Sequence, residues 1–311
     1  MKKQIYLIFV FSLAAHVVFS QTVEEYLNTG ERYFLMGRFH EARSAVEEAV
    51  HLDPKNALLH FYLGSIYYEL NENILALKYF SNTIELDNTF ASAYFWRAGI
   101  YEKILQDHAN ALDNYDMAVY LEPENDRYRR DRGNFLYTVI GDFISARIDF
   151  HRAVEIDPLN YLNFQYRGVF YAMYGLHEAA LEDYNAAIKL NSEETSNFSN
   201  KGTTLLFLGR EKEAMENFNI ALRLDNTNFR AYFDRGHAHF RLGMYNEAVL
   251  DFTEVIRINP NPIDYRNAYF NRAHLYRLLA DQSDNPTQAG YYLDKAKLDE
   301  SVVSRLDSQQ R

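Results

Sequence analysis

The stretch FRAYFDRGHAHFRLG, residues 229–243, has three close counterparts earlier in the chain, and together they predict the fold class. The counterparts are ENDRYRRDRGNFLY (124–137), YLNFQYRGVFYAMYG (161–175) and TSNFSNKGTTLLFLG (195–209). They begin units spaced by about 34 residues, and self-similarity at such a period is typical of a repeat array. We therefore expect stacked repeats rather than one compact core or two globular domains.

Eight such units cover most of the 311 residues. Their expected limits are 23–56, 57–90, 91–125, 126–160, 161–194, 195–228, 229–262 and 266–300. The third and fourth units are one residue longer, and the eighth carries an insertion at Asp281–Asn285. Residues 301–311 are expected to form a polar C-terminal tail, and the segment from Tyr291 onward is interpreted as a polar cap.

The same positions carry the same kind of side chain in each unit. Position 8 is glycine or alanine, position 20 is alanine, and position 24 is usually aromatic, as in Phe80 and Tyr115. Apolar residues at positions 4, 8 and 11, and again at 20, 24 and 27, have the spacing of two amphipathic helices. Glycine stands where the first helix must end in four units: Gly37, Gly175, Gly209 and Gly243. Each unit is therefore predicted to be an α-helical hairpin, and stacking of hairpins predicts a right-handed superhelical solenoid.

This pattern resembles the tetratricopeptide repeat (TPR) family. The family pattern Trp-x-x-Leu-Gly-x-x-Tyr…Ala-x-x-x-Phe…Pro is matched in the first unit by Tyr26, Gly30, Tyr33, Ala42 and Pro54, and again in later units. The resemblance covers nearly all of residues 22–300. It implies an all-α solenoid that binds a protein or peptide, without a cofactor.

One departure from the family concerns position 7, where the usual leucine is basic in six units: Arg97, Arg132, Arg167, Lys201, Arg235 and Arg272. A basic stripe could bind an anionic ligand. Acids at position 22 or 23 offer internal partners instead, and we prefer that interpretation: Asp113, Asp149, Asp183 and Asp251. Four acids for six bases leave two bases without an assigned partner.

A second stripe, at positions 2, 5, 9 and 12 of each first helix, is expected to line a concave wall. Aromatic and arginine side chains are frequent there and suit an extended peptide with an acidic group. The candidate partner-binding residues are Phe61, Tyr68, Phe95, Trp96, Arg127, Arg130, Asn134, Tyr137, Arg230, Phe233, His237 and Phe240. Alternatively, these side chains contact neighbouring repeats. Some family members clamp a C-terminal carboxylate; Arg130 and Asn134 match that clamp approximately, but Tyr166 replaces an expected asparagine, so the clamp is incomplete.

The N-terminus has the features of a secretory signal peptide at residues 1–20. Lys2 and Lys3 precede an apolar run from Ile5 to Val18, and a small residue, Ser20, precedes Gln21. We expect cleavage after Ser20 and a periplasmic or secreted protein of a bacterial envelope. An uncleaved N-terminal anchor is the alternative. The remaining chain has no apolar run long enough to span a bilayer.

Composition excludes several functions. The chain has no cysteine, so disulfides and thiolate chemistry are excluded. Removal of Lys2 and Lys3 leaves 30 basic residues against 43 acidic ones, a net charge of about −13 that disfavours nucleic acid. We find no phosphate-binding glycine loop, no metal-binding motif and no catalytic grouping, and expect neither an enzyme nor a small-molecule substrate. The expected function is a protein-binding scaffold; a self-associating structural element is the alternative.

Overall fold

The computed structural model describes residues 22–258 and 262–309, which are helical apart from short connections. They divide into two compact units, with the boundary between Ile156 and Asp157. The expected signal peptide, residues 1–20, lies outside the described residues. In the described part of the chain, no helix is both long and apolar enough to cross a membrane.

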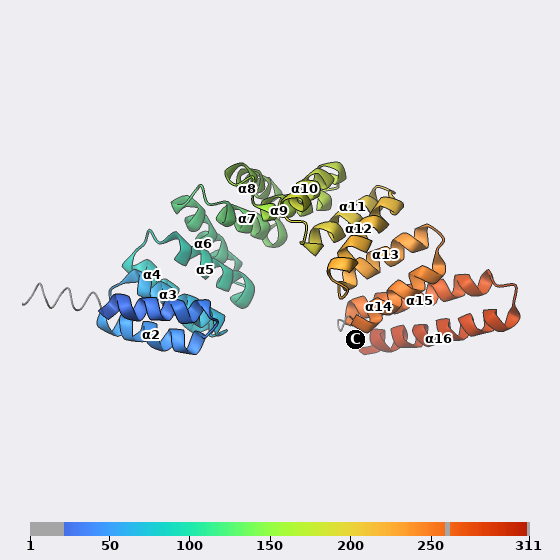
Figure 1. The fold of residues 1–311 in the computed structure, drawn as a ribbon, viewed down its shortest axis with the longest axis horizontal. Helices are drawn as coiled ribbons and strands as arrows, with labels where there is room; N and C mark the ends of the chain where they lie inside the picture. Colours follow the sequence, from blue (N-terminus) through green and yellow to red (C-terminus); the bar gives the residue numbers. More distant parts are fainter. Residues whose placement is uncertain (1–21, 259–261, 310–311) are drawn as a thin grey trace, which may run out of the picture. The chain divides into compact units, whose positions relative to one another are not determined.

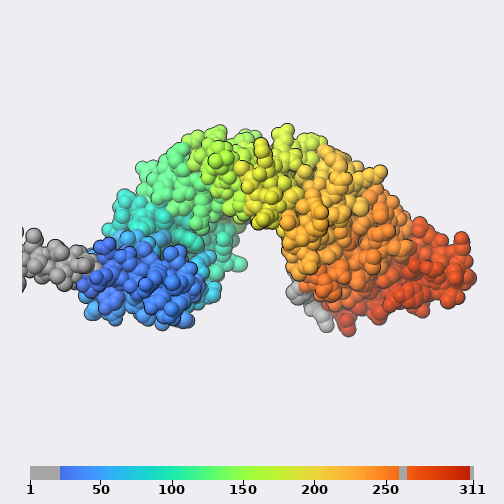
Figure 2. All heavy atoms as spheres, in the orientation of Figure 1, coloured from blue at the N-terminus to red at the C-terminus, as the bar shows by residue number. Residues whose placement is uncertain are grey.

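The first unit begins with helical residues 22–35 and continues with helical pairs in chain order (Figure 1). Its further helices are α2 (Phe39–Leu52), α3 (Ala57–Glu69), α4 (Asn73–Leu86), α5 (Ala91–Ile100), α6 (His108–Leu121), α7 (Asp126–Phe135) and α8 (Phe143–Ile156). Two π-helical turns, η1 (Tyr101–Leu105) and η2 (Leu136–Ile140), extend α5 and α7. Neighbouring helices pack against one another, so the blue and cyan atoms of α2–α6 form a continuous packed surface (Figure 2).

The second unit contains four further hairpins. Its helices are α9 (Tyr161–Met173), α10 (His177–Leu190), α11 (Thr195–Phe207), α12 (Glu211–Leu224), α13 (Phe229–Arg241), α14 (Tyr245–Ile258), α15 (Pro262–Asp281) and α16 (Pro286–Gln309). Each helix packs against the helices before and after it within the unit. The prediction of an all-α array of helical hairpins is confirmed.

In the six repeats with glycine at position 8, that glycine lies against the bulky residue at position 24. A Cβ atom added at Gly64 would lie 2.7 Å from the Phe80 ring, and one added at Gly202 would lie 2.6 Å from the Phe218 ring. The alanines at position 20 have 0% exposure from the first to the seventh repeat. The interpretation of positions 8, 20 and 24 as close-packing sites is therefore confirmed.

The predicted buried stripe of the first helices needs a correction. From the second repeat onward positions 3, 8 and 10 are buried, as Leu59 and Ile66 illustrate in α3. Position 4 is half-buried in most repeats, and position 11 is buried in only some of them, as at Leu205. Position 4 carries Tyr94, for example, and its ring lies beside the guanidinium of Arg97 at 5.5 Å. Aromatic side chains at position 4 therefore cover a cation rather than fill the centre of the hairpin.

The one-residue excess of the third and fourth repeats is located in the π-helical turns. A π turn holds one more residue than an α turn, so η1 and η2 absorb the insertion and leave the second helix in register. Both turns end in a left-handed residue, Gln106 (φ 53°) and Gly141 (φ 78°). The predicted turn glycines Gly37, Gly175, Gly209 and Gly243 have φ between 70° and 74°, which confirms their role.

The last hairpin is longer than the sequence pattern indicated. Ala296 is fully buried and Asp299 pairs with Arg272, so Ala296 occupies the position assigned to Ala289, which is half-buried. Leu293, expected at the core position 24, is exposed. Both helices extend beyond the length of the other hairpins, and α16 includes residues 301–309, which were expected to form a tail. The repeat pattern did not predict the longer hairpin, because the additional residues shift all later residues of the repeat relative to the numbered positions.

Candidate functional site

Five of the six basic residues at position 7, all arginines, lie between helices and bind acids or an amide there, whereas burial lowers the pKa of the sixth, Lys201. Arg167 binds both carboxylate oxygens of Asp183, with Nε and Nη2 at 2.9 and 2.7 Å, and Arg235 binds Asp251 with Nη2 at 2.6 Å. The three predicted pairs to Asp149, Asp183 and Asp251 are all present, and each carboxylate is buried. The stripe is therefore structural, as preferred from the sequence.

The same arginines also reach the preceding repeat. Arg132 on α7 binds Asp149 on α8 and, through Nη1, Asp116 on α6 at 2.9 Å. Arg235 on α13 joins Asn219 on α12 in the same way, at 2.7 Å. One guanidinium thus links three helices of two successive repeats, and its five N–H donors suit that task.

One predicted partner, Asp113, is wrong, and the structure supplies a partner for Arg272, to which none had been assigned. Asp113 is exposed, and Arg97 instead donates from Nε to Asn114 Oδ1 at 2.7 Å. Arg272 binds Asp299 in the elongated hairpin, with the two residues 27 positions apart rather than the 16 seen for Arg167 and Asp183. Local spacing could not identify either partner.

In the first unit, Arg127 and Trp96 form the centre of the candidate binding surface. The Arg127 guanidinium carbon lies 5.1 Å from the Trp96 ring centre and 4.8 Å from that of Phe95. Trp96 also contacts Tyr68, with ring centres 5.2 Å apart. The Arg127 side chain is 50% exposed and its Nε lies 3.8 Å from Asp131. The rings of Trp96 and Phe95 therefore hold the Arg127 cation at the surface in a defined position.

Three candidates of this unit are not exposed as expected. Phe95 is buried and stacks on Tyr128 at 4.7 Å. Arg130 is buried, and its Nε binds Asp131 at 3.1 Å. Phe61 is half-buried and contacts the Phe80 ring. These residues share position 5, which faces the second helix of the hairpin, so the exposed surface comes from positions 2, 9 and 12 and from Trp96. Arg130, which is buried and paired with Asp131, is therefore not exposed to a partner's carboxylate as the incomplete clamp would need.

Asn134 and Tyr137 lie on the same helical face as Arg127 and are half-buried. The Tyr137 ring packs against Phe143 at the start of α8, 6.1 Å between ring centres. The structure also adds Asp131, which the sequence analysis did not single out. Burial raises the pKa of Asp131, and the nearby guanidinium groups of Arg130 and Arg127 act in the opposite direction.

The second unit carries the remaining four candidates on α13. Arg230 is exposed and Phe240 is 36% exposed. Phe233 and His237 are half-buried and both contact the Phe252 ring, at 5.5 and 5.3 Å. Burial lowers the pKa of His237, which favours its neutral form.

A cavity of about 290 Å³ opens beside these residues, between α11 and α13. It is lined by Ser199, Asn200, Thr203, Phe229, Arg230, Phe233 and Asp234. Asp234 Oδ2 accepts a 2.5 Å hydrogen bond from the Thr203 hydroxyl, and burial raises the pKa of the Asp234 carboxyl. The sequence analysis named Arg230 and Phe233 but missed Asp234. The sequence feature that could have identified Asp234 is that the fourth and the seventh repeat both carry aspartate at position 6, as Asp131 and Asp234.

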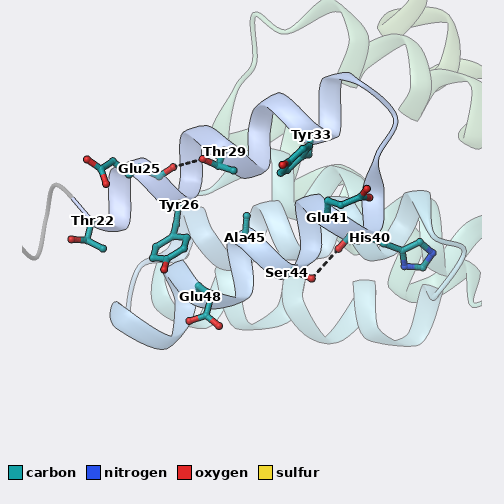
Figure 3. A pocket seen from close by; sticks show the side chains of 10 residues that line it. All are labelled: Thr22, Glu25, Tyr26, Thr29, Tyr33, His40, Glu41, Ser44, Ala45 and Glu48. Atoms are coloured by element: carbon teal, nitrogen blue, oxygen red, sulfur yellow. Dashed lines mark hydrogen bonds between the residues drawn. The ribbon is translucent and has the colours of Figure 1, made fainter.

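A larger hollow of about 740 Å³ is lined by the first repeat alone. Figure 3 shows Tyr26 reaching from helical residues 22–35 toward α2, where Ala45 and Glu48 lie. The hydroxyl groups of its Thr29 and Ser44 donate to carbonyls one turn earlier in their own helices, at 2.8 and 3.1 Å. These two hydroxyl groups are thus engaged with the backbone of their own helices.

The described residues contain no group of three or more His, Cys, Asp or Glu side chains placed to hold a metal ion. Their closest His–Asp contact joins His239 Nδ1 to Asp251 Oδ2 at 2.8 Å, in the buried network of Arg235. Both partners are buried. This pair stabilises the hairpin and is not open to a substrate.

Comparisons with known proteins agree with this architecture. Models described as tetratricopeptide repeat match residues 27–89 and 229–262, and one described as TPR repeat matches residues 202–243. The chain is 30% identical over 96 residues to mouse RNA polymerase II-associated protein 3; the match covers 31% of this chain and only 14% of that protein.

Two solved structures share the fold. A tetratricopeptide repeat protein from Parabacteroides merdae ATCC 43184 has a TM-score of 0.62 at 18% identity, with 80% of this chain and 97% of that chain covered. Yeast Tom70 has a TM-score of 0.58 at 20% identity, with 86% and 56% covered. The recurring hairpins, their small–aromatic contacts and the matches to three models of one repeat type agree: this chain belongs to the tetratricopeptide repeat family.

Proposed function

We propose that the protein is a non-catalytic scaffold that binds a protein or peptide partner along the exposed faces of its first helices. Proteins of this family generally act as protein-interaction scaffolds, and their repeats bind protein or peptide partners. The proposal places this protein in the bacterial envelope or the secreted space, because residues 1–20 have the composition of a signal peptide.

The observation that carries the proposal is the Tyr68–Trp96–Arg127 surface of the first unit. Arg127 is half-exposed, yet two aromatic rings and Asp131 restrict its conformations. A partner carboxylate that binds it loses little side-chain entropy, because the arginine is already ordered. Rigid aromatic rings beside it add contact area at low entropic cost. Aromatic–arginine clusters of this kind are frequent among interface residues that contribute most to binding.

The chain offers a direct reporter, because Trp96 is its only tryptophan. We would screen pools of acetylated ten-residue peptides for a change in Trp96 fluorescence on addition to the purified protein. Peptides with an acidic residue should bind, and Arg127→Ala should weaken their binding at least tenfold, because the charge-assisted contact is lost.

Arg152→Ala is the matched control. Arg152 is an exposed arginine of the same unit that pairs with Glu124 and Glu155 on the surface. The Arg152→Ala variant should bind the peptides as the wild type does. Equal binding by the wild type and Arg127→Ala would show that this surface is not the site, and the absence of any response to the pools would contradict peptide binding by the Trp96 surface.

A further inference from the structure

The fourth and seventh repeats carry the same pair of charged residues at the same positions. Arg127 and Asp131 stand at positions 2 and 6 of the fourth repeat, and Arg230 and Asp234 stand there in the seventh. The two repeats differ at position 5, which is Arg130 in the fourth and Phe233 in the seventh. This difference determines what lies in front of the aspartate.

In the fourth repeat the aspartate is occupied by the chain itself. Arg130 Nε lies 3.1 Å from Asp131 Oδ1, and the Arg130 side chain is buried. The position-6 carboxylate of this fold is thus a place where a guanidinium can bind away from solvent. Asp131 pairs with Arg130 there although burial raises the pKa of the Asp131 carboxyl.

In the seventh repeat the equivalent arginine is replaced by an aromatic ring. Asp234 Oδ2 accepts from Thr203, which supplies a neutral hydrogen bond instead of a charge. Among the described residues, Asp234 forms no ion pair with a lysine or arginine; exposed Arg230 and half-buried His237 influence its carboxyl only through longer-range electrostatics. The carboxylate therefore faces the 290 Å³ cavity with a lone-pair-bearing oxygen available.

The cavity has the composition that a basic side chain requires. Phe229 and Phe233 line it with aromatic rings, and Ser199, Asn200 and Thr203 add hydrogen-bonding groups beside the carboxylate. A planar guanidinium stacks on aromatic rings and forms two parallel bonds to a carboxylate. Burial disfavours the ionised form of Asp234, and an incoming cation would offset that cost.

We propose that the cavity between α11 and α13 binds an arginine side chain of the partner peptide, through Asp234 and with the rings of Phe229 and Phe233 around it. The inference rests on the proposed peptide-binding function and gives it a specificity: the partner carries a basic residue that takes the place Arg130 holds in the fourth repeat. Arg230, which is exposed and also lines the cavity, is free to bind the peptide backbone or an acidic residue next to the bound arginine of the peptide.

The first test uses a small probe and does not depend on any peptide. N-acetyl-arginine N-methylamide is titrated into the full chain carrying labelled threonine methyl groups, with the uncharged citrulline analogue as reference. The arginine probe should shift the Thr203 methyl resonance saturably, at a concentration at least tenfold below that needed for citrulline. Asp234→Asn, which keeps the shape and the bond to Thr203, should abolish this preference.

Two further variants sharpen the result. Asp284→Asn removes one negative charge at an exposed loop residue and should bind the arginine probe as the wild type does. Phe233→Arg recreates the arrangement of the fourth repeat, so its own arginine should occupy Asp234 and exclude the probe, while Phe233→Met should only weaken binding. Equal shifts with arginine and citrulline, or an unchanged response in Asp234→Asn, would overturn the inference.

The second test places the arginine in peptides. Pools of acetylated ten-residue peptides with a central arginine should be retained at least fivefold better than pools with a central citrulline, by the wild type but not by Asp234→Asn. If neutral pools bind as well as basic ones, the scaffold function stands and the arginine pocket is wrong. If the probe binds but no peptide pool is retained, the pocket stands and the proposed peptide-binding function fails.

Discussion

Replacement of Arg132 by methionine tests whether the position-7 arginines hold successive repeats together. Arg132 donates to Asp149 from Nε at 2.7 Å and from Nη2 at 2.8 Å, and to Asp116 at 2.9 Å. Asp149 is 1% exposed. Methionine retains much of the apolar volume but leaves that carboxylate buried with Arg129 alone, at 3.2 Å.

Removal of one partner of a buried ion pair costs about 3–5 kcal/mol, because the remaining charge is neither hydrated nor paired. Arg129 still contributes one hydrogen bond, so we expect Arg132→Met to lower the free energy of unfolding by about 2–4 kcal/mol. The double variant Arg132→Met/Asp149→Leu removes both charges and should recover most of that loss, since a well-packed apolar pair is often as stable as a buried ion pair.

The assay is urea unfolding followed by far-UV circular dichroism and, in parallel, by the fluorescence of Trp96 in the neighbouring repeat. Two probes are needed because repeat arrays can unfold in parts rather than in one step. Arg152→Met, in which an exposed surface ion pair is lost, is the control and should leave the urea midpoint unchanged. A loss below about 1 kcal/mol for Arg132→Met, or a double variant less stable than the single one, would refute the reasoning.

Three other changes have definite expected outcomes. Gly202→Ala places a Cβ atom 2.6 Å from the Phe218 ring and should cost about 1–3 kcal/mol in urea unfolding, whereas Gly290→Ala, which meets nothing within 4 Å, should gain up to about 1 kcal/mol; equal effects would contradict the packing argument. Gln106→Gly relieves a left-handed residue (φ 53°) and should raise stability by about 0.5–1 kcal/mol, and a lower melting temperature would disprove it. Because the folded-state pKa of Asp234 is raised, ionisation of its carboxyl opposes folding near pH 7, and Asp234→Asn should unfold at a higher urea concentration than the wild type at that pH. This advantage should disappear as the pH falls below about 4, where the wild-type carboxyl is protonated. A stability advantage of Asp234→Asn that grows toward low pH would contradict the argument.

The sequence predicted the helical hairpins well because the packing that defines them is local. Ala42 and Ala76, at position 20, are fully buried, and Gly64 and Gly202 lie against the aromatic residues 16 positions later. These contacts join neighbouring helices of one hairpin, so a fixed spacing along the chain specifies them. The same locality explains why Asp149, Asp183 and Asp251 could be matched with their arginines.

The sequence pattern was less successful where one residue more or less changes which side chain faces the core. Asp113 and Asn114 are adjacent, and the chain after η1 brings Asn114 rather than Asp113 to Arg97. In the last hairpin, the additional turns of α15 and α16 bring Asp299 to Arg272. The helical period predicts which face of a helix a residue lies on only to within about one residue. This is too coarse to choose between two adjacent residues as the partner of an arginine.

From the amino-acid sequence we could predict the repeat, the two helices of each unit and the glycine turns between them, and we could prefer a structural role for the basic stripe. Which candidate residues remain exposed depends on the packing of the helices and could not be predicted in this way. Phe95 and Arg130 are buried because position 5 turns toward the second helix, whereas Trp96 and Arg127 retain access to solvent. Asp234 gains its cavity from α11, a neighbouring first helix about thirty residues away in the chain. Exposure and cavities depend on how several helices meet, and no spacing within a single helix encodes that arrangement.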